Sequence, residues 1–302
     1  MSGESPEISV VVALRDRLDL TRTFLVDLER TLAGVPHEVV LVDDGSTDGT
    51  RDFLRERQGG GLRAVFQDEN RGFAAANNRG AREARAPRLA FLNNDLVLRE
   101  GWFEPMRAAL DGSGGMVGNV QTNAHTGRID HAGIVFTPWG IPEHWGQGYL
   151  RIPGRGARRF RAVTAACCLV RRELFLGEGV FDEAYRNGFE DIDLCLRLDA
   201  RGHANRVALE SRVGHWVSAS PGRKGSDAEN IRLFLSRWGG ATRRWGLRDW
   251  PRHYLRRHLR RPWRLNGPKT IDALLLLARL RNRAPAWMER RYRALAETGG
   301  PA

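Results

Sequence analysis

Residues 89–95, Leu-Ala-Phe-Leu-Asn-Asn-Asp, join an apolar run to a carboxylate, and this stretch decides the fold class. A short apolar run is typical of a buried strand, and a carboxylate at its C-terminal tip is costly unless it meets water, a metal or a cation. Residues 38–48, Glu-Val-Val-Leu-Val-Asp-Asp-Gly-Ser-Thr-Asp, repeat this arrangement. Because strand C-termini line the ligand crevice of an open parallel sheet, the two tips predict a metal-assisted nucleotide site. Acids that simply end strands and cap helices are the alternative.

Strands and helices alternate in the first part of the chain. We expect strands at residues 8–13, 38–42, 62–67 and 88–92. Three helices are expected between them: one that Asp19 caps, one at residues 50–57 and one from about residue 73 to 86. This alternation favours parallel βαβ units with right-handed crossovers.

The pattern changes after about residue 115. Glycine, histidine, tryptophan and proline become frequent through residues 118–156, which predicts loops and antiparallel strands. Further elements are expected as a strand at 163–170, a helix from Glu190 to Gly202 and a strand at 203–208. From about residue 227 the pattern indicates helices, with breaks at Pro251, Pro262, Pro268 and Pro285.

Composition indicates a globular protein with a substantial core. The 302 residues are 41% hydrophobic and 28% charged, enough for one large domain or two modest ones. The three cysteines, at 167, 168 and 195, lie in apolar surroundings with no zinc spacing, so we expect buried, reduced thiols in a cytoplasmic protein. The N-terminus lacks an apolar signal core, and no apolar run approaches the ~20 residues that span a bilayer.

The net charge of +12 is concentrated in the C-terminal tail, where residues 243–302 hold 16 Lys and Arg against four Asp and Glu. Trp250, Tyr254, Trp263 and Trp287 are interleaved with arginines, as in interfacial helices that hold acidic lipid headgroups. We therefore favour binding to an anionic membrane surface. A solvated helical surface is the second interpretation, and nucleic-acid binding is the least favoured.

A third acid cluster lies in residues 189–197, Phe-Glu-Asp-Ile-Asp-Leu-Cys-Leu-Arg. Glu190 and Asp191 fall in the first turn of the expected helix, where the macrodipole favours anions. Capping explains one acid well and three acids in four positions less well. A carboxylate held at a cleft could instead act as general base on a hydroxyl.

The order of these motifs resembles family 2 glycosyltransferases. It runs Val-Asp-Asp-Gly-Ser-Thr-Asp, Asn-Arg-Gly-Phe-Ala-Ala-Ala-Asn-Asn-Arg-Gly, Phe-Leu-Asn-Asn-Asp, Phe-Asp-Glu, Phe-Glu-Asp-Ile-Asp-Leu-Cys-Leu-Arg and Gly-His. Within the family it looks most like bacterial rhamnosyltransferase-type enzymes of cell-envelope polysaccharide assembly. The resemblance covers roughly residues 8–240.

The resemblance implies a GT-A fold, an α/β architecture with a mostly parallel sheet flanked by helices and an antiparallel acceptor-side portion. It implies a catalytic domain over residues 1–242, with a nucleotide-binding half at 8–115 and an acceptor half at 116–242. Charge and pattern add a basic helical extension at 243–302. The implied reaction is inverting hexosyl transfer from a dTDP-, UDP- or GDP-linked sugar to a glycan or lipid-linked acceptor. The implied location is the inner face of the plasma membrane.

The resemblance also assigns roles to residues. It implies a donor site formed by Ala13, Arg15, Asp43, Asp44, Arg71, Asn77, Asn93 and Asn94, in which Asp43 and Asp44 meet the base and ribose. It implies Mg²⁺ or Mn²⁺ held by Asp95 and His215, a catalytic base at Asp191 beside Glu190, and acceptor contacts from Trp139, His144 and Trp145. Asn93 stands where the family usually has an Asp, so weaker metal binding is expected.

Several of these roles have structural alternatives. Arg71 could form an exposed salt bridge, and His215 could be a satisfied buried histidine. Trp139, His144 and Trp145 could be ordinary core residues.

Two other functions compete. A sugar-nucleotide nucleotidyltransferase normally wants a glycine-rich loop after the first strand, where this chain reads Ala-Leu-Arg-Asp-Arg-Leu-Asp at residues 13–19. A basic nucleic-acid-binding adaptor would leave Asp95 and the Glu190–Asp191 pair without a purpose.

Overall fold

The computed structural model describes residues 5–112, 114–216, 226–259, 263 and 265–300. The chain divides into two compact units. Unit 1 comprises residues 1–133 and 147–221, and unit 2 comprises residues 134–146 and 222–302. The domain boundary expected at residue 242 falls inside one long helix, α7 (Asp227–Leu259).

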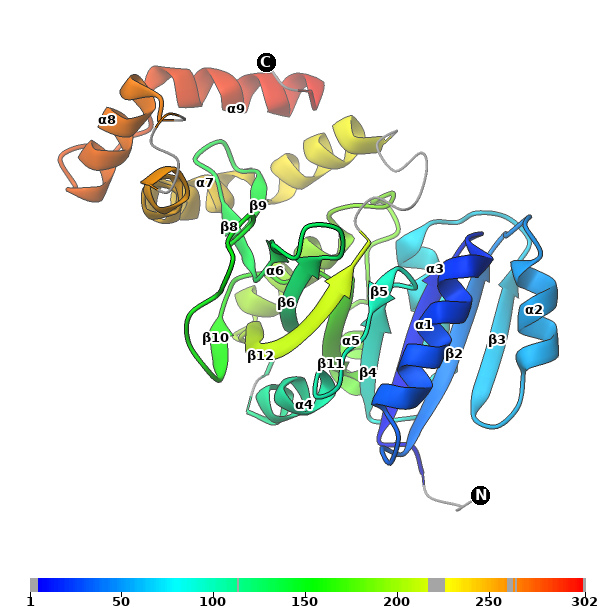
Figure 1. The fold of residues 1–302 in the computed structure, drawn as a ribbon. Helices are drawn as coiled ribbons and strands as arrows, with labels where there is room; N and C mark the ends of the chain where they lie inside the picture. Colours follow the sequence, from blue (N-terminus) through cyan, green and yellow to red (C-terminus); the bar gives the residue numbers. More distant parts are fainter. Residues whose placement is uncertain (1–4, 113, 217–225, 260–262, 264, 301–302) are drawn as a thin grey trace. The chain divides into compact units, whose positions relative to one another are not determined.

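Unit 1 is built on a large mixed sheet with the strand order β10-β12-β6-β11-β4-β1-β2-β3 (Figure 1). Four of these strands, β1 (Ile8–Leu14), β2 (His37–Asp44), β3 (Leu62–Gln67) and β4 (Arg88–Leu92), pair in parallel. Their carboxyl ends therefore lie at one edge of the sheet, as the acid-tipped strands predict.

Alternate strand residues contact helices on opposite faces of this parallel half. Val10, Val12, Val39 and Leu41 are buried in one core with α1 (Leu18–Thr31) and α2 (Thr50–Arg57). Val40 and Val42 pack on the other face against α3 (Phe73–Glu83). This helix lies so close to the sheet that a Cβ on Gly80 would come within 2.5 Å of Val11, which explains its small residues.

The second half of the sheet is mixed, as the changed pattern after residue 115 predicts. β6 (Val117–Asn123) runs parallel to β12 (Arg206–His215), and β11 (Cys167–Arg171) runs antiparallel to both β4 and β6. The short strands are β5 (Leu96–Val97), β7 (Ile129–His131) and β10 (Ala157–Arg159). The helices are α4 (Phe103–Asp111), α5 (Arg172–Gly177) and α6 (Glu190–Ala200).

The cysteines are buried in unit 1, and Cys167 and Cys168 lie on β11. Burial raises the pKa of all three thiols above the ordinary value. The expectation of buried, reduced cysteines is confirmed.

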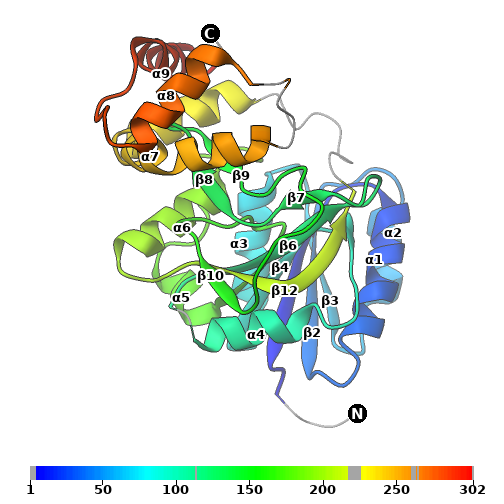
Figure 2. The same cartoon turned by 60° about the vertical axis from the view of Figure 1, so that its left-hand side comes forward.

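The described residues of unit 2 form a hairpin and three helices. The hairpin pairs β8 (Ile134–Phe136) with β9 (Pro142–His144). The long helix α7 packs against α8 (Gly267–Leu277), α9 (Ala286–Thr298) and β8. Figure 2 shows α7, α8 and α9 lying together.

Three local expectations were wrong. The N-cap of α1 is Arg17, in the left-handed region at φ 58°, and Asp19 instead accepts hydrogen bonds from the Arg17 side chain. Pro251 lies inside α7 without ending it. The strand expected at residues 203–208 is β12, which begins and ends later because it pairs with β6 and β5. The break at Pro262 lies outside the described residues, whereas Pro268 and Pro285 lie at the starts of α8 and α9.

No helix in the described part of the chain combines the length and the apolar character needed to cross a membrane.

Candidate functional site

The tip of β4 is held in place by neighbouring backbone and side chains. The Asn93 N–H donates to the Ala166 carbonyl at 2.9 Å, beside the pairing of β4 with β11. The Asn94 side chain donates to the Thr21 hydroxyl on α1 at 2.9 Å. Both asparagines anchor the turn that presents Asp95 between β4 and β5.

Asp95 and His215 face each other because β5 pairs with the end of β12, where Leu96 lies opposite His215. His215 Nε2 lies 3.2 Å from Asp95 Oδ1, and the two side chains are only 8% and 13% exposed. Within the described structure, neither atom has a hydrogen-bond partner, and neither does His215 Nδ1. Buried polar atoms are normally satisfied, so this pair fits a ligand that brings positive charge.

The residues present fit a divalent cation in part. A carboxylate oxygen and an imidazole nitrogen are both metal ligands, and a hard cation can complete its shell with diphosphate oxygens and water. No group of three or more His, Cys, Asp or Glu side chains with metal-site geometry occurs among the described residues. The described residues therefore bring two candidate ligands together, Asp95 and His215.

The carboxylates at the tip of β2 have the opposite surroundings. Asp43 is fully buried, with Oδ2 2.9 Å from Nε of Arg51 and Oδ1 accepting the Ser46 N–H at 3.2 Å. Asp44 accepts the N–H groups of Arg71 and Gly72 at 2.7 and 2.9 Å. Burial raises the pKa of Asp44, although these two N–H donors oppose the rise.

The acids at the start of α6 differ in their surroundings. Asp193 is buried and pairs with Arg197 at 2.9 Å, and buried Glu190 accepts the Gly188 N–H at 2.7 Å. Asp191 is half-buried and accepts the N–H of Ala165 at 2.9 Å and that of Ile192 at 2.8 Å. Of the three, Asp191 is the most accessible carboxylate, and each of its oxygens retains acceptor capacity.

Two consecutive residues connect Asp191 to the tip of β4. The Ala165 N–H holds the Asp191 carboxylate, and the Ala166 carbonyl accepts the Asn93 N–H. The structure thus brings together, at the carboxyl edge of the parallel strands, a possible base and a pair of possible metal ligands.

The remaining donor-site candidates lie at the same edge. Ala13 is half-buried near the end of β1, and the exposed Arg15 approaches Asp16 at 3.8 Å. Arg71 is exposed and lies 4.0 Å from Glu183. Asn77 is buried and donates to the Phe73 carbonyl within α3.

The acceptor-site candidates belong to unit 2. Trp139 and Trp145 are buried, and His144 is half-buried on β9. Trp139 packs against Trp250 and Trp287, with ring centroids 6.2 and 5.9 Å apart. These contacts match the core-packing alternative for Trp139.

Sequence reasoning missed Asn78, whose side chain joins α3 to a distant segment. It donates to the Phe181 carbonyl and to Glu183, and it accepts the Phe181 N–H. The adjacent Phe73 N–H donates to Asn187. Since the partners lie more than 100 residues away, no local pattern marks this role.

The chain matches known proteins over most of its length. The model of "Glycosyl transferase family 2" matches residues 9–176. Validoxylamine A glucosyltransferase of Streptomyces hygroscopicus subsp. limoneus is 41% identical over 76% of this chain and 55% of its own length. The O-antigen biosynthesis protein RfbC of Myxococcus xanthus is 34% identical over 72% of this chain, which spans only 18% of that protein.

The fold matches solved glycosyltransferases. The structure of GalNAc-T7 with UDP, GalNAc and Mn²⁺ superposes with a TM-score of 0.63 at 16% identity, covering 91% of this chain and 55% of that one. The expected GT-A fold is confirmed. The family model covers more than half of the chain, and the expected motif order agrees with it. The chain belongs to the family 2 glycosyltransferases.

Proposed function

We propose that this protein transfers a hexosyl group, with inversion, from a nucleotide-diphosphate sugar to an acceptor hydroxyl. Beyond family membership, the observation that carries this proposal is the pair of buried polar atoms, Asp95 Oδ1 and His215 Nε2, that have no hydrogen-bond partner in the described structure. The Ala165–Ala166 segment connects this pair to the Asp191 carboxylate. Transfer at an anomeric carbon needs both a cation for the departing diphosphate and an acceptor for the hydroxyl proton.

Asp95 and His215 would hold Mg²⁺ or Mn²⁺ against the donor diphosphate. Such a cation, when bound, stabilises the negative charge that develops on the leaving diphosphate. GalNAc-T7, the solved structure with a similar fold, contains Mn²⁺ and UDP. Asn93 offers an amide and no second carboxylate at this strand tip, so donor binding should depend strongly on Asp95.

Asp191 would accept the proton of the incoming hydroxyl. Its two backbone N–H partners fix the orientation of the carboxylate and leave acceptor capacity on both oxygens. Glu190 would support it by holding the turn at Gly188.

The tip of β2 would shape the donor site through the backbone. Asp44 holds the Arg71–Gly72 turn, and Asp43 holds the Ser46 turn. Ala13, Arg15, Asn77 and Asn94 would complete the nucleotide side of the crevice from the adjoining elements. The exposed Arg71 side chain would add a cationic contact to the donor phosphates.

The acceptor would be a glycan or a lipid-linked glycan, contacted by His144 and Trp145, because Trp139 packs in the core of unit 2. The name of the Myxococcus relative, which concerns O-antigen biosynthesis, supports a role in polysaccharide assembly. The excess of arginine in residues 243–302 would hold the protein on an anionic membrane surface at the cytoplasmic face.

Incubation with UDP-, dTDP- and GDP-sugars plus Mn²⁺ tests the proposal. Release of a nucleoside diphosphate that rises when an acceptor glycan is added supports sugar transfer. Release of pyrophosphate from sugar phosphate and nucleoside triphosphate would instead establish a nucleotidyltransferase. If the protein releases neither nucleoside diphosphate nor pyrophosphate with any donor but binds RNA, the result would favour the nucleic-acid-binding adaptor.

A further inference from the structure

Helix α8 presents an apolar face to solvent. Ile271, Leu274 and Leu277 recur every three residues, which places them along one side of the helix, and Leu280 follows just beyond its end. Their exposed fractions run from 41% for Leu277 to 78% for Leu280, and Trp263, before the helix, is 77% exposed. Contiguous exposed apolar side chains of this size mark an interaction surface.

The opposite side of α8 is fixed inside unit 2. Asp272, Ala273 and Leu276 are buried there. The Asp272 carboxylate accepts the Trp287 indole N–H at 2.6 Å and pairs with Arg281. Because this inner face already anchors the helix, the outer leucines are not needed to hold it in place.

The tryptophans expected to reach a membrane are mostly used internally. Trp250 and Tyr254 are buried, and Trp250 stacks on Tyr254 and contacts Trp287. Of the four aromatic residues considered in the tail, Trp263 alone is exposed in the described part of the chain. The apolar contact surface of unit 2 is therefore the leucine-rich face of α8.

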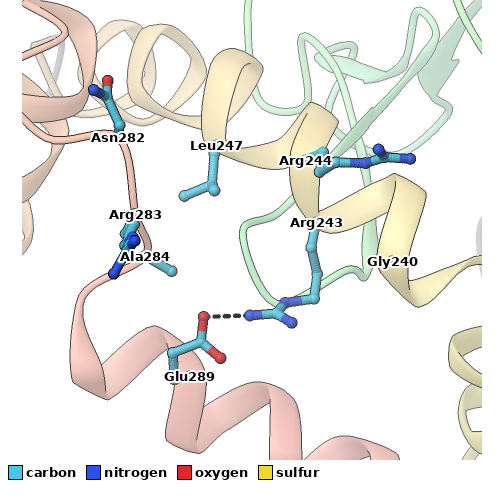
Figure 3. Close-up of a pocket in the computed structure, with 8 residues that line it drawn as sticks. All are labelled: Gly240, Arg243, Arg244, Leu247, Asn282, Arg283, Ala284 and Glu289. Carbon is cyan, nitrogen blue, oxygen red and sulfur yellow. Dashed lines mark hydrogen bonds and ion pairs between the residues drawn. The ribbon is translucent and has the colours of Figure 1, made fainter.

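Positive charge surrounds this face. Arg279 and Arg283 are exposed directly after α8, and Arg256 and Arg257 are exposed at the end of α7, which packs against α8. Arg243, Arg244 and Arg283, which Figure 3 shows, are among the residues that line a cavity in this unit. The volume of this cavity is about 410 Å³. Glu289 is the one acid in that lining, and it pairs with Arg243.

We propose that the outer face of α8 inserts into the headgroup–acyl boundary of an anionic bilayer, with Ile271, Leu274 and Leu277 in the apolar zone and the surrounding arginines on lipid phosphates. This proposal rests on the membrane binding proposed above and specifies the helix that inserts. It is independent of the catalytic step. An apolar ridge with a basic rim is the composition of an interfacial helix. Two copies of this face would oppose arginine with arginine, so charge complementarity favours acidic lipid over a second copy.

The test compares variants of the full chain in vesicle flotation. Vesicles of phosphatidylcholine, with and without phosphatidylglycerol, are used at low and high salt. The variant Ile271→Gln/Leu274→Gln/Leu277→Gln should lose about a hundredfold or more in partition coefficient. Leu150→Gln in unit 1 is the matched control, because Leu150 is 66% exposed, and it should partition like wild type.

A second variant separates insertion from surface attraction. Arg256→Gln/Arg257→Gln/Arg279→Gln/Arg283→Gln should lose the preference for phosphatidylglycerol and most of the salt dependence. If only this variant loses binding, the charge-based membrane proposal stands and insertion of α8 is overturned. If wild type sediments as a dimer and the triple Gln variant sediments as a monomer, the face binds a second copy instead. Donor binding should be unchanged in both variants, so a failed catalytic proposal would be seen separately.

Discussion

The tips of β2 and β4 both carry carboxylates after an apolar strand, yet their surroundings are opposite. At the tip of β2, each carboxylate oxygen of Asp43 and Asp44 already contacts Arg51 or a backbone N–H group. At the tip of β4, Asp95 Oδ1 lies 3.2 Å from His215 Nε2, and neither atom has a hydrogen-bond partner in the described structure. The first tip holds loops, whereas the second leaves acceptor capacity for a ligand.

The difference follows from what each tip meets. Desolvating a carboxylate is costly unless other groups compensate. At β2, the following turn supplies the Ser46 N–H to Asp43, and the segment before α3 supplies the Arg71 and Gly72 N–H groups to Asp44. Gly45, at φ 75°, lets this turn approach so closely that a Cβ there would lie 2.9 Å from the Glu69 carbonyl carbon. At β4, the two asparagines fix the turn and no described donor reaches Asp95 Oδ1.

Asp191 accepts two backbone N–H groups, as Asp44 does after β2, and keeps acceptor capacity for a ligand, as Asp95 does. Its substitution should have the largest effect. In Asp191→Asn, the asparagine side chain keeps the shape of the carboxylate but cannot accept a proton. Turnover should therefore fall by roughly 10²–10⁴-fold while donor affinity persists. Nucleoside diphosphate release and donor-induced thermal shift measure the two quantities. Asp193→Asn is the control, because Asp193 pairs with Arg197 and should mainly affect stability. Near-normal turnover in Asp191→Asn would move the base to Glu190 or Asp193.

The loop-holding role of Asp43 predicts a loss of stability. Asp43→Asn removes the charge that faces Arg51, and the free energy of unfolding should fall by about 2–3 kcal/mol in a urea titration. Asp52→Asn is a matched control, because its pair with Arg55 is exposed and should contribute little. Equal stability losses in the two variants would remove the distinction between the buried and exposed acids of this region.

The pH dependence of stability tests Asp44, with a smaller effect. Its pKa is raised in the folded state by burial, so the folded protein keeps this proton after the unfolded chain has released it. Stability contributed by Asp44 is therefore lost as pH rises above about 4. Relative to Asp44→Asn, wild type should become less stable from pH 4 upward in urea titrations. The opposite slope would mean that the Arg71 and Gly72 donors outweigh burial.

Much of this organisation could be predicted from the sequence. The apolar runs before Asp43 and Asp95 predict adjacent parallel strands, because buried strands need continuous apolar residues and strand tips share one edge. The alanine-rich stretch after Gly72 predicts α3, although its close approach at Gly80 is visible only in three dimensions.

Other features depend on contacts between distant segments. The ion pair of Asp43 with Arg51 and the hydrogen bonds of Asn78 to Phe181 have no periodic signature in the sequence. The tryptophans of the tail are interleaved with arginines, as in interfacial helices, yet Trp250 on α7 is buried, and α9 packs against this helix. The local sequence pattern predicts the strands and the acids that follow them. It does not predict which of these carboxylates find hydrogen-bond or ion-pair partners in the fold.

Metal-dependent donor binding by Asp95→Ala tests the central claim most directly. The variant should keep its thermal stability without ligand, because Asp95 Oδ1 has no hydrogen-bond partner in the described structure, and it should lose the Mn²⁺-dependent part of the donor-induced thermal shift. Asp43→Asn should show the reverse, with lower stability and a retained Mn²⁺-dependent shift. Full Mn²⁺ dependence in Asp95→Ala would contradict the account.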